Sequence, residues 1–364
     1  MAEQLKERFF TQQSINQMAD AIGEYYPPFN KEKFLELIYD PTWKQLELKE
    51  KMYHTTKCLH QTLPENYGEA IAVLENAAPD VKGFEAMTLP DFVEQYGLDE
   101  DWEVSLHALR VFTRYSSSEF AIRPFLLRDP VRTVEFLLSC AKDQYHGVRR
   151  LASEGSRPRL PWAMALPEFK QDPAPIIPLL EQLKDDPSEI VRRSVANNLN
   201  DISKDNPEIA LGICEEWYGA GKERDKIVKH ACRTLLKAGN KRAMVLFGYC
   251  DPTHLKVENL KTQEESIKIG DHQFFLFDLL IPGNEKENNV RLEYAVYYMK
   301  ANGKHSKKVF KITENKYPPG THSFKRKQSF KNFSTRKHYA GEHQVGIIIN
   351  GEEKAKISFN LSEA

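Results

Sequence analysis

The sequence from His146 to Trp162, HGVRRLASEGSRPRLPW, joins an amphipathic segment to a loop rich in arginine and proline. At 3.6 residues per turn, Arg150 and Glu154 lie four residues apart and can pair. They stand beside an apolar helix face, which consists of Val148, Leu151, Ala152 and Gly155. The stretch therefore predicts a short helix with one buried face, followed by a cationic loop that ends in an aromatic ring.

The same helical pattern recurs twice downstream. VRRLASE at Val148 is followed by VRRSVANN at Val191 and VKHACRT at Val228, at intervals of 43 and 37 residues. Such intervals are typical of two-helix HEAT repeats, whose stacked pairs bury a continuous core. An N-cap residue and a proline precede the first helix of each pair, at Asp129-Pro130, Asp172-Pro173 and Asn206-Pro207. The sequence therefore predicts an α-solenoid.

After about Asp251 the sequence changes to short alternating segments that are typical of strands. Strands are expected over 273–281, 290–300, 308–312, 343–350 and 353–361, and Asn302-Gly303 and Asn350-Gly351 match tight hairpin turns. These features predict a small immunoglobulin-like β-sandwich. The expected fold class is therefore multidomain, α then β, with a helical N-terminal region over 1–100, HEAT-like repeats over 101–250 and the sandwich over 255–364.

The net charge of -1 over 364 residues conceals a strong asymmetry. Acidic residues outnumber basic ones about two to one from Met1 to Arg110, whereas between 304 and 337 Glu314 is the one acid. A basic segment of this kind favours an anionic partner, with nucleic acid as the first candidate. The bases of this segment are Lys304, Lys307, Lys308, Lys311, Lys316, Lys325, Arg326, Lys327, Lys331, Arg336 and Lys337.

The sequence gives little support to disulfide, metal or membrane chemistry. Its five cysteines are scattered, without CxxC spacing or a paired histidine pattern, which indicates a reducing compartment. The N-terminus is charged and does not resemble a secretory signal, and no apolar run is long enough to span a bilayer. We expect a cytoplasmic protein with no metal and no cofactor.

The arginines of the organising stretch predict phosphate contacts. Arg150, Arg157 and Arg159 cannot all be neutralised by Glu154, and guanidinium groups bind phosphate well. Basic pairs recur at Arg149-Arg150 and Arg192-Arg193, where they either line a binding surface or pair with aspartates inside the repeat stack. We expect Arg149, Arg150, Arg157, Arg159, Arg192, Arg193, Lys325, Arg326 and Lys327 to contact an anionic ligand.

Two carboxylates are candidate catalytic groups. Glu119 lies one repeat element upstream of Glu154, so that stacking of helices could bring them together, and paired acids can stabilise a cationic sugar. Each has a structural alternative: Ser116 to Glu119 matches a capping box, and Glu154 can pair with Arg150 or Arg157. Trp162 offers an indole face for stacking on a base or cation, or it buries as the anchor of its loop.

Several segments resemble the AlkC family of bacterial DNA-3-methyladenine glycosylases, within the HEAT-like AlkD superfamily. They are SSSEFAIRPF, HGVRRLASEGSRPRLPWAMALPEF, VRRSVANNLNDISKDNP and FSTRKHYAGEHQVGIIINGEE. The resemblance implies a monofunctional enzyme that removes 3-methyladenine, and 3-methylcytosine, from duplex DNA in base excision repair. It places the family's reactive acids on Glu119 and Glu154, its aromatic partner on Trp162 and its phosphate-gripping arginines on Arg150, Arg157 and Arg159.

The implied partner is duplex DNA with alkylated bases. The resemblance also implies a monomer that does not bind membranes and acts at the nucleoid of a bacterial cell. An N3-methylated base already carries positive charge, so it leaves as a neutral molecule and needs no general acid. Two other hypotheses remain open: a non-catalytic HEAT-repeat scaffold that binds nucleic acid, and a carbohydrate hydrolase with an accessory sandwich. Under the scaffold hypothesis the pairing of Glu119 with Glu154 is coincidental. The hydrolase hypothesis does not explain the arginines and lysines.

Overall fold

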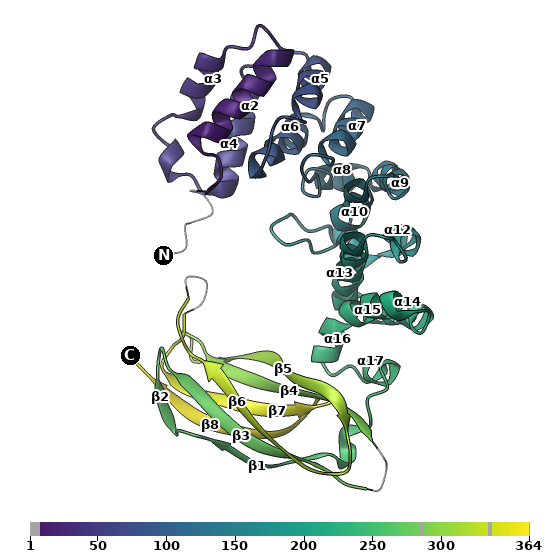
Figure 1. Cartoon of the computed structure of the whole chain (residues 1–364), viewed down its shortest axis with the longest axis vertical. Helices are drawn as coiled ribbons and strands as arrows, with labels where there is room; N and C mark the ends of the chain where they lie inside the picture. The colour runs from purple at the N-terminus through teal and green to yellow at the C-terminus, as the bar shows by residue number, and fades with distance from the viewer. Residues whose placement is uncertain (1–7, 284–286, 334–336, 364) are drawn as a thin grey trace. The chain divides into compact units, whose positions relative to one another are not determined.

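The chain divides into two compact units, Met1–Ala231 and Cys232–Ala364. The computed structural model describes residues 8–283, 287–333 and 337–363. The first unit is helical, and the second combines two short helices with two β-sheets (Figure 1). An α region followed by a β-sandwich was the fold class that the sequence predicted, and it is confirmed.

The helices of the first unit follow one another in stacked layers along an arc (Figure 1). They are α2 (Gln12–Tyr25), α3 (Lys31–Ile38), α4 (Leu48–His60), α5 (Tyr67–Ala77), α6 (Thr88–Tyr96), α7 (Trp102–Phe112), α8 (Arg123–Arg128), α9 (Pro130–Cys140), α10 (His146–Gly155), α11 (Pro167–Gln171), α12 (Ile177–Leu183), α13 (Glu189–Asp205), α14 (Pro207–Trp217) and α15 (Lys222–Ala231). Short 3-10 turns occur at Trp43–Gln45, Phe84–Met87 and Ala174–Ile176.

The repeat predicted from sequence is present as a stack of helices. α10, α13 and α15 carry the three recurring motifs, and each packs on the next. Their leading valines, Val148, Val191 and Val228, are completely buried. The preceding helices also begin as expected: Pro130 and Pro207 occupy the first turns of α9 and α14, and the Asp129 carboxylate accepts the Arg132 amide at 3.1 Å.

The second unit contains α16 (Arg233–Lys237), α17 (Lys241–Leu246), a 3-10 turn at Pro252–His254 and two sheets with the strand orders β1-β3-β6 and β2-β8-β7-β4-β5. All neighbouring strands are antiparallel except β2 and β8. The strands are β1 (Lys256–Thr262), β2 (Ser266–Lys268), β3 (His272–Ile281), β4 (Asn288–Met299), β5 (His305–Tyr317), β6 (Gly320–Ser329), β7 (Gly341–Ile349) and β8 (Glu352–Ser362).

The sequence predicted β3, β4, β5, β7 and β8, and all of these except β5 contribute buried side chains to the core. β3, β4, β7 and β8 supply most of the core, with Phe275, Phe277, Val345 and Ile347 almost fully buried. Analysis of the sequence missed β1, β2 and β6. β1 and β6 lie at the edges of their sheet and carry mostly exposed side chains, so they lack the apolar alternation that identifies a half-buried strand.

The second unit begins earlier than the predicted sandwich because residues that follow α16 and α17 contact the sheets. The Asn289 side-chain amide donates to the Phe247 carbonyl at 3.0 Å, and the Asn350 amide donates to the Cys250 carbonyl at 2.8 Å. Gly239, just after α16, lies directly against Gly351 in the β7–β8 turn. Among the described residues, no helix is both long enough and apolar enough to cross a bilayer.

The contact between Gly239 and Gly351 generates a prediction about stability. A Cβ at Gly239 would lie 2.5 Å from the Gly351 carbonyl oxygen, and the φ of Gly239 is +73°. Gly239→Ala should therefore lower the free energy of unfolding for two reasons. Overpacking costs about 1–3 kcal/mol, and the left-handed conformation costs an alanine roughly 1–2 kcal/mol. Urea unfolding of the variant would measure the sum.

Gly303→Ala is the matched control for this measurement. Gly303 has a φ of +74° but nothing within 4 Å of its added Cβ, so only the conformational cost applies. Equal losses of unfolding free energy in the two variants would mean that the chain accommodates a Cβ at position 239 without overpacking.

Candidate active site

Glu119 and Glu154 lie close together in the structure. Glu154 sits at the end of α10 and is 6% exposed, while Glu119 is half-buried in the turn before α8. Gly155 permits this approach, because a Cβ there would lie 2.7 Å from the Ile122 side chain and 4.0 Å from the Glu119 Cα. The capping-box interpretation of Glu119 is wrong, since α8 begins only at Arg123 with Ile122 as its N-cap.

Arg150 joins the two carboxylates. Its guanidinium donates to Glu119 Oε2 at 3.0 Å and lies 3.8 Å from Glu154 Oε1. Burial lowers the pKa of Arg150, but the charge and hydrogen bond of Glu119 and the charge of Glu154 outweigh it, so the pKa stays above its usual value. Arg150 thus remains a permanent cation between the acids and reduces their mutual repulsion.

A chain of alternating charges continues from Glu154. Arg157 donates to Glu154 Oε1 at 2.6 Å and to Asp201 Oδ2 at 2.8 Å, and Lys204 donates to Asp201 Oδ1 at 2.8 Å. Arg157 is 7% exposed and Asp201 is 1% exposed. Burial acts to lower the pKa of Arg157, and the two acids raise it above its ordinary value overall. Arg157 is therefore an internal ion-pair partner that fixes the Glu154 carboxylate.

Helix α13 supplies hydrogen-bond partners for the end of α10 and for the start of the loop that follows it. Ser194 donates to Glu154 Oε2 at 2.6 Å, Asn198 donates to the Ser153 carbonyl at 2.8 Å, and Asp205 accepts two bonds from Arg159 at 2.6 and 2.7 Å. These hydrogen bonds raise the pKa of Arg159 and lower that of Asp205. The residues, together with Asp201, occur at helical spacing on one face: 194, 198, 201 and 205. Sequence analysis missed this polar stripe, although its periodicity was visible.

Trp162 projects from the loop into solvent. Its side chain is 74% exposed, and its φ of 66° is left-handed, which is uncommon for a residue other than glycine. In Figure 1 the loop that follows α10 extends from the inner side of the arc. The interpretation of Trp162 as a buried anchor is therefore wrong, and Leu160, which is 6% exposed, fills that role instead.

Arg123 holds the base of this loop and was not identified from the sequence. It is fully buried and donates to the carbonyls of Met164 at 2.7 Å, Gly155 at 2.9 Å and Arg157 at 2.9 Å. Burial and the charge of Arg157 lower the pKa of Arg123 to about 10, while Asp201 and Glu94 act in the opposite direction. The sequence signal is weak, because a proline in the first turn of a helix is common and does not indicate what the preceding arginine binds.

Arg149 and Arg192 occupy equivalent places inside the repeat stack. Arg149 donates to both oxygens of Asp186, at 2.5 and 2.9 Å, and to two carbonyls before α10. Arg192 likewise donates to two carbonyls before α13 and to Glu223 at 2.9 Å. Asp186 is 6% exposed, so its pair with Arg149 is an internal link between repeats.

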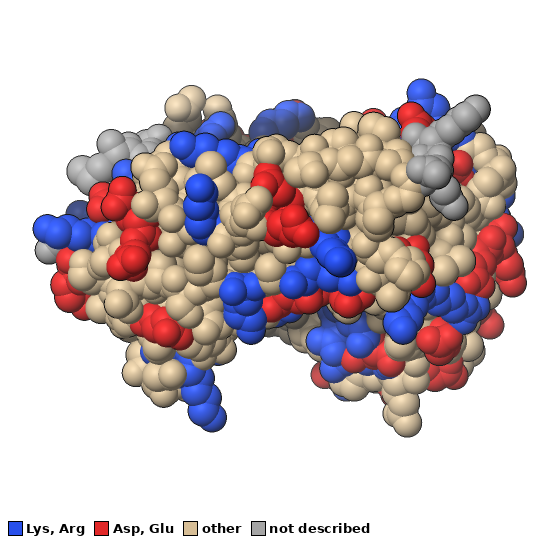
Figure 2. Space-filling model, turned by 90° about the horizontal axis from the view of Figure 1, so that it is seen from below, with Lys and Arg blue, Asp and Glu red and all other residues tan. Residues whose placement is uncertain are grey.

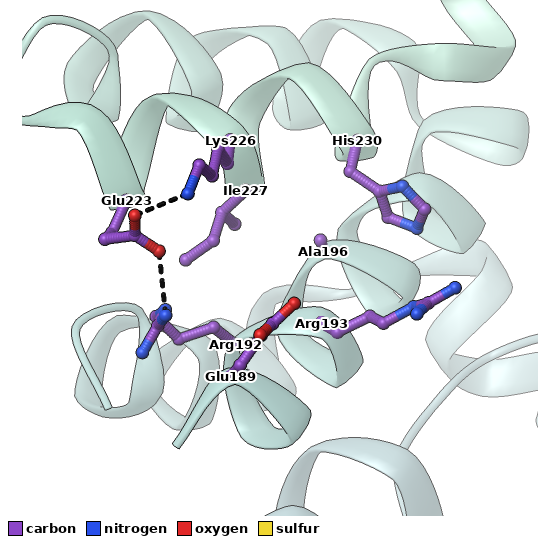
Figure 3. Close-up of a pocket in the computed structure, with 8 residues that line it drawn as sticks. All are labelled: Glu189, Arg192, Arg193, Ala196, Glu223, Lys226, Ile227 and His230. Carbon is purple, nitrogen blue, oxygen red and sulfur yellow. Dashed lines mark hydrogen bonds and ion pairs between the residues drawn. The ribbon is translucent and has the colours of Figure 1, made fainter. Parts of the chain in front are cut away.

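Arg193 has a different environment from Arg192. It is exposed and lines a pocket of about 240 Å³ between α13 and α15, together with His230 and Lys226. Figure 3 shows Lys226, Glu223 and Arg192 linked on one side of this pocket, with Arg193 and His230 on the other. Arg193 is therefore available to a ligand, whereas Arg192 is engaged.

The basic residues of the sandwich also differ in their exposure. Lys325 and Lys327 are exposed on the outer face of β6, whereas Arg326 is half-buried and lies 5.9 Å from the centroid of Phe324. On the face that Figure 2 shows, basic and acidic side chains are interspersed. Several lysines have acidic neighbours, such as Lys307 with Glu353 at 3.0 Å, and Arg336 lies outside the described residues.

No metal centre is apparent in the described ranges. Within 8–283, 287–333 and 337–363, no group of three or more His, Cys, Asp or Glu residues could hold a metal ion. The five cysteines are free, and four of them are buried. Carboxylates and guanidinium groups form most of the ion pairs near α10, and the indole of Trp162 is exposed.

Comparison with known proteins places this architecture in a family. Residues 256–363 match the family described as the C-terminal Ig-like domain of uncharacterised protein YhaZ. The Bacillus subtilis (strain 168) protein YhaZ, described as uncharacterized, is 46% identical over 358 residues, which cover 98% of this chain and 99% of that protein.

A solved structure shares both the fold and much of the sequence. The Pseudomonas fluorescens alkylpurine DNA glycosylase AlkC, bound to DNA that contains an abasic site analog, is 36% identical to this chain. The match covers 99% of this chain and 100% of the other, with a TM-score of 0.93. Because the likeness includes both units at this level of identity, the chain belongs to the AlkC family.

Proposed function

We propose that this protein is a monofunctional DNA glycosylase of base excision repair. It would hydrolyse the N-glycosidic bond of cationic N3-alkylated bases, 3-methyladenine and 3-methylcytosine, in duplex DNA. The observation that carries the proposal is the joined pair of Glu119 and Glu154 beside the exposed Trp162, in a chain that matches a DNA-bound alkylpurine glycosylase over its whole length. The protein would act as a monomer at the bacterial nucleoid.

The reaction requires charge stabilisation more than proton transfer to the base. As the bond between C1′ and the base nitrogen breaks, the base takes the electron pair and leaves neutral, and positive charge remains on the sugar. Water then adds to C1′ and releases a proton. Glu119 and Glu154 would stabilise the sugar cation, since preorganised charges are most effective where charge develops. Arg150 and Arg157 would hold both carboxylates in place.

The remaining residues would position the DNA. The exposed indole of Trp162 can contact a cationic base, because the face of an aromatic ring attracts positive charge. Arg193, Lys325 and Lys327 are exposed and can contact phosphates. Arg150 and Arg159 bind Glu119 and Asp205, but their side chains keep 27% and 40% exposure, so we also include them among the phosphate contacts. Arg149, Arg157, Arg192 and Arg326 are engaged or half-buried, which favours structural roles over the DNA contacts expected from the sequence.

The alternative is a HEAT-repeat scaffold that binds nucleic acid without catalysis. It predicts that methylated duplex DNA binds but remains intact. With the purified protein, we expect free 3-methyladenine to appear in the soluble fraction, measured by chromatography and mass spectrometry. Binding without any released base, under conditions where the protein is folded, would support the scaffold and contradict the proposed activity.

The two acids give a second prediction. Glu119→Gln and Glu154→Gln should each reduce single-turnover excision by about 10²- to 10³-fold, with little change in DNA affinity. We expect the larger loss at Glu154, which is the more buried of the two. Excision rates, dissociation constants and melting temperatures would be measured for each variant.

Asp186→Asn provides the matched control for loss of a buried ion pair. Asp186 is as buried as Glu154 and accepts two bonds from Arg149, within the repeat stack. This variant should melt earlier yet excise at the parental rate. A glutamine variant at 119 or 154 that behaves like Asp186→Asn would show that its carboxylate serves stability alone.

The sandwich gives a third prediction. If Lys325 and Lys327 contact phosphates, replacing both by alanine should reduce the slope of log affinity against log salt by about 1.8, or roughly 0.9 per contact. Lys307→Ala is the control, because Lys307 is already paired with Glu353. A double variant with the parental slope would remove these lysines from the DNA interface.

A further inference from the structure

Lys49 of α4 contacts two of the three segments that carry candidate catalytic residues, the Trp162 loop and the turn that bears Glu119. Its ammonium donates a hydrogen bond of 2.7 Å to the carbonyl oxygen of Trp162. The same group lies 4.7 Å from the ring centroid of Phe120, the residue directly after Glu119. One side chain therefore joins α4 to the tip of the Trp162 loop and to the turn that bears Glu119.

The stability of α4 does not explain a lysine at this position. Lys49 lies in the first turn of the helix, where the dipole disfavours a positive charge. The start of α4 has its own stabilisation in a capping box formed by Glu47 and Glu50. The contacts with Trp162 and Phe120 are the interactions that this lysine gains.

Two carboxyl groups of α6 lie close enough to interact with the ammonium. Asp91 is buried and accepts a hydrogen bond from Thr56, and burial raises its pKa to about 6. Burial, followed by the charge of Asp91, raises the pKa of Glu94 to about 7. Lys49 opposes both shifts. The charge of Lys49 is thus part of the environment of both carboxyl groups.

The Trp162 loop is anchored at its base, and at its tip the Ala163 amide donates to the Leu160 carbonyl at 3.4 Å while Lys49 binds the Trp162 carbonyl. Arg123 binds the Met164 carbonyl, and the Leu166 amide donates to the Pro158 carbonyl at 3.1 Å. Trp162 itself has a left-handed φ and an exposed ring. Such a conformation persists only when surrounding contacts impose it, and the bond from Lys49 is a contact of this kind.

We propose that Lys49 is a positioning residue that holds Trp162 in its projecting conformation and sets it against Glu119. The inference rests on the proposed glycosylase activity for its consequence in catalysis. The geometric part, in which Lys49 restrains the loop, can be measured in the free protein without any substrate.

The first experiment is hydrogen exchange of the segment 158–166 in the free protein. Lys49→Met should accelerate exchange there by about tenfold, as expected for loss of one hydrogen bond to a charged group. Lys51→Met is the matched control, because Lys51 also lies in the first turn of α4 but stacks on Trp43, 4.9 Å from its ring centroid. Unchanged exchange in Lys49→Met would overturn the proposal.

The second experiment compares single-turnover excision of 3-methyladenine from duplex DNA. Lys49→Met should excise about tenfold more slowly, in proportion to the loosened contact, with the parental dissociation constant and melting temperature. Lys49→Arg should restore most of the rate, since a guanidinium can also donate to the carbonyl and stack on Phe120. Lys49→Met combined with Trp162→Ala should be no slower than Trp162→Ala alone.

The outcomes separate this inference from the proposed function. Additive losses in the double variant, or weaker DNA binding with a reduced salt slope, would make Lys49 a direct DNA contact and overturn its positioning role. If the parental protein releases no base, the glycosylase proposal fails, while the exchange experiment still decides whether Lys49 restrains Trp162.

Discussion

The pairing of α10 and its loop with α13 is the interaction on which the candidate site depends. Arg157 is almost fully buried between Glu154 and Asp201, which come from different helices. Removal of one partner from a buried ion pair leaves an uncompensated charge and typically costs about 3–5 kcal/mol. The distance and orientation of the two helices are therefore coupled to the position of the Glu154 carboxylate.

This coupling suits catalysis by preorganised charge. Glu154 receives Arg157 on one oxygen and Ser194 on the other, while Arg150 connects it to Glu119. None of these groups must reorganise when positive charge develops nearby, which is the condition under which electrostatic stabilisation is strongest. The same contacts explain why a carboxylate is tolerated in a buried position, since its partners satisfy both oxygens.

Trp162 likewise combines a restrained backbone with an exposed side chain. Arg123 and Lys49 fix the loop from below, and the indole remains in solvent. An exposed indole in a left-handed conformation gains no stability from burial, so the arrangement favours a role with a ligand. Strand β6 of the sandwich also carries both engaged and exposed side chains. Arg326 lies against the ring of Phe324, whereas its neighbours Lys325 and Lys327 face solvent.

The sequence by itself determined the repeat architecture, the strands with a buried face and the clustering of Glu154 with its arginines, because these depend on local periodicity and spacing. It also identified Glu119 and Trp162 as candidates, and the family resemblance assigned the same roles to them. It could not assign partners to the arginines. Asp186, Asp201 and Asp205 lie 37 to 46 residues from the arginines that they bind, one repeat away. Only the packing of α10 on α13 decides which acids meet which cations, and thereby separates internal ion pairs from side chains that remain free to bind. The exposure of Trp162 was equally undecided, because it depends on Arg123 and Lys49, which approach from distant helices.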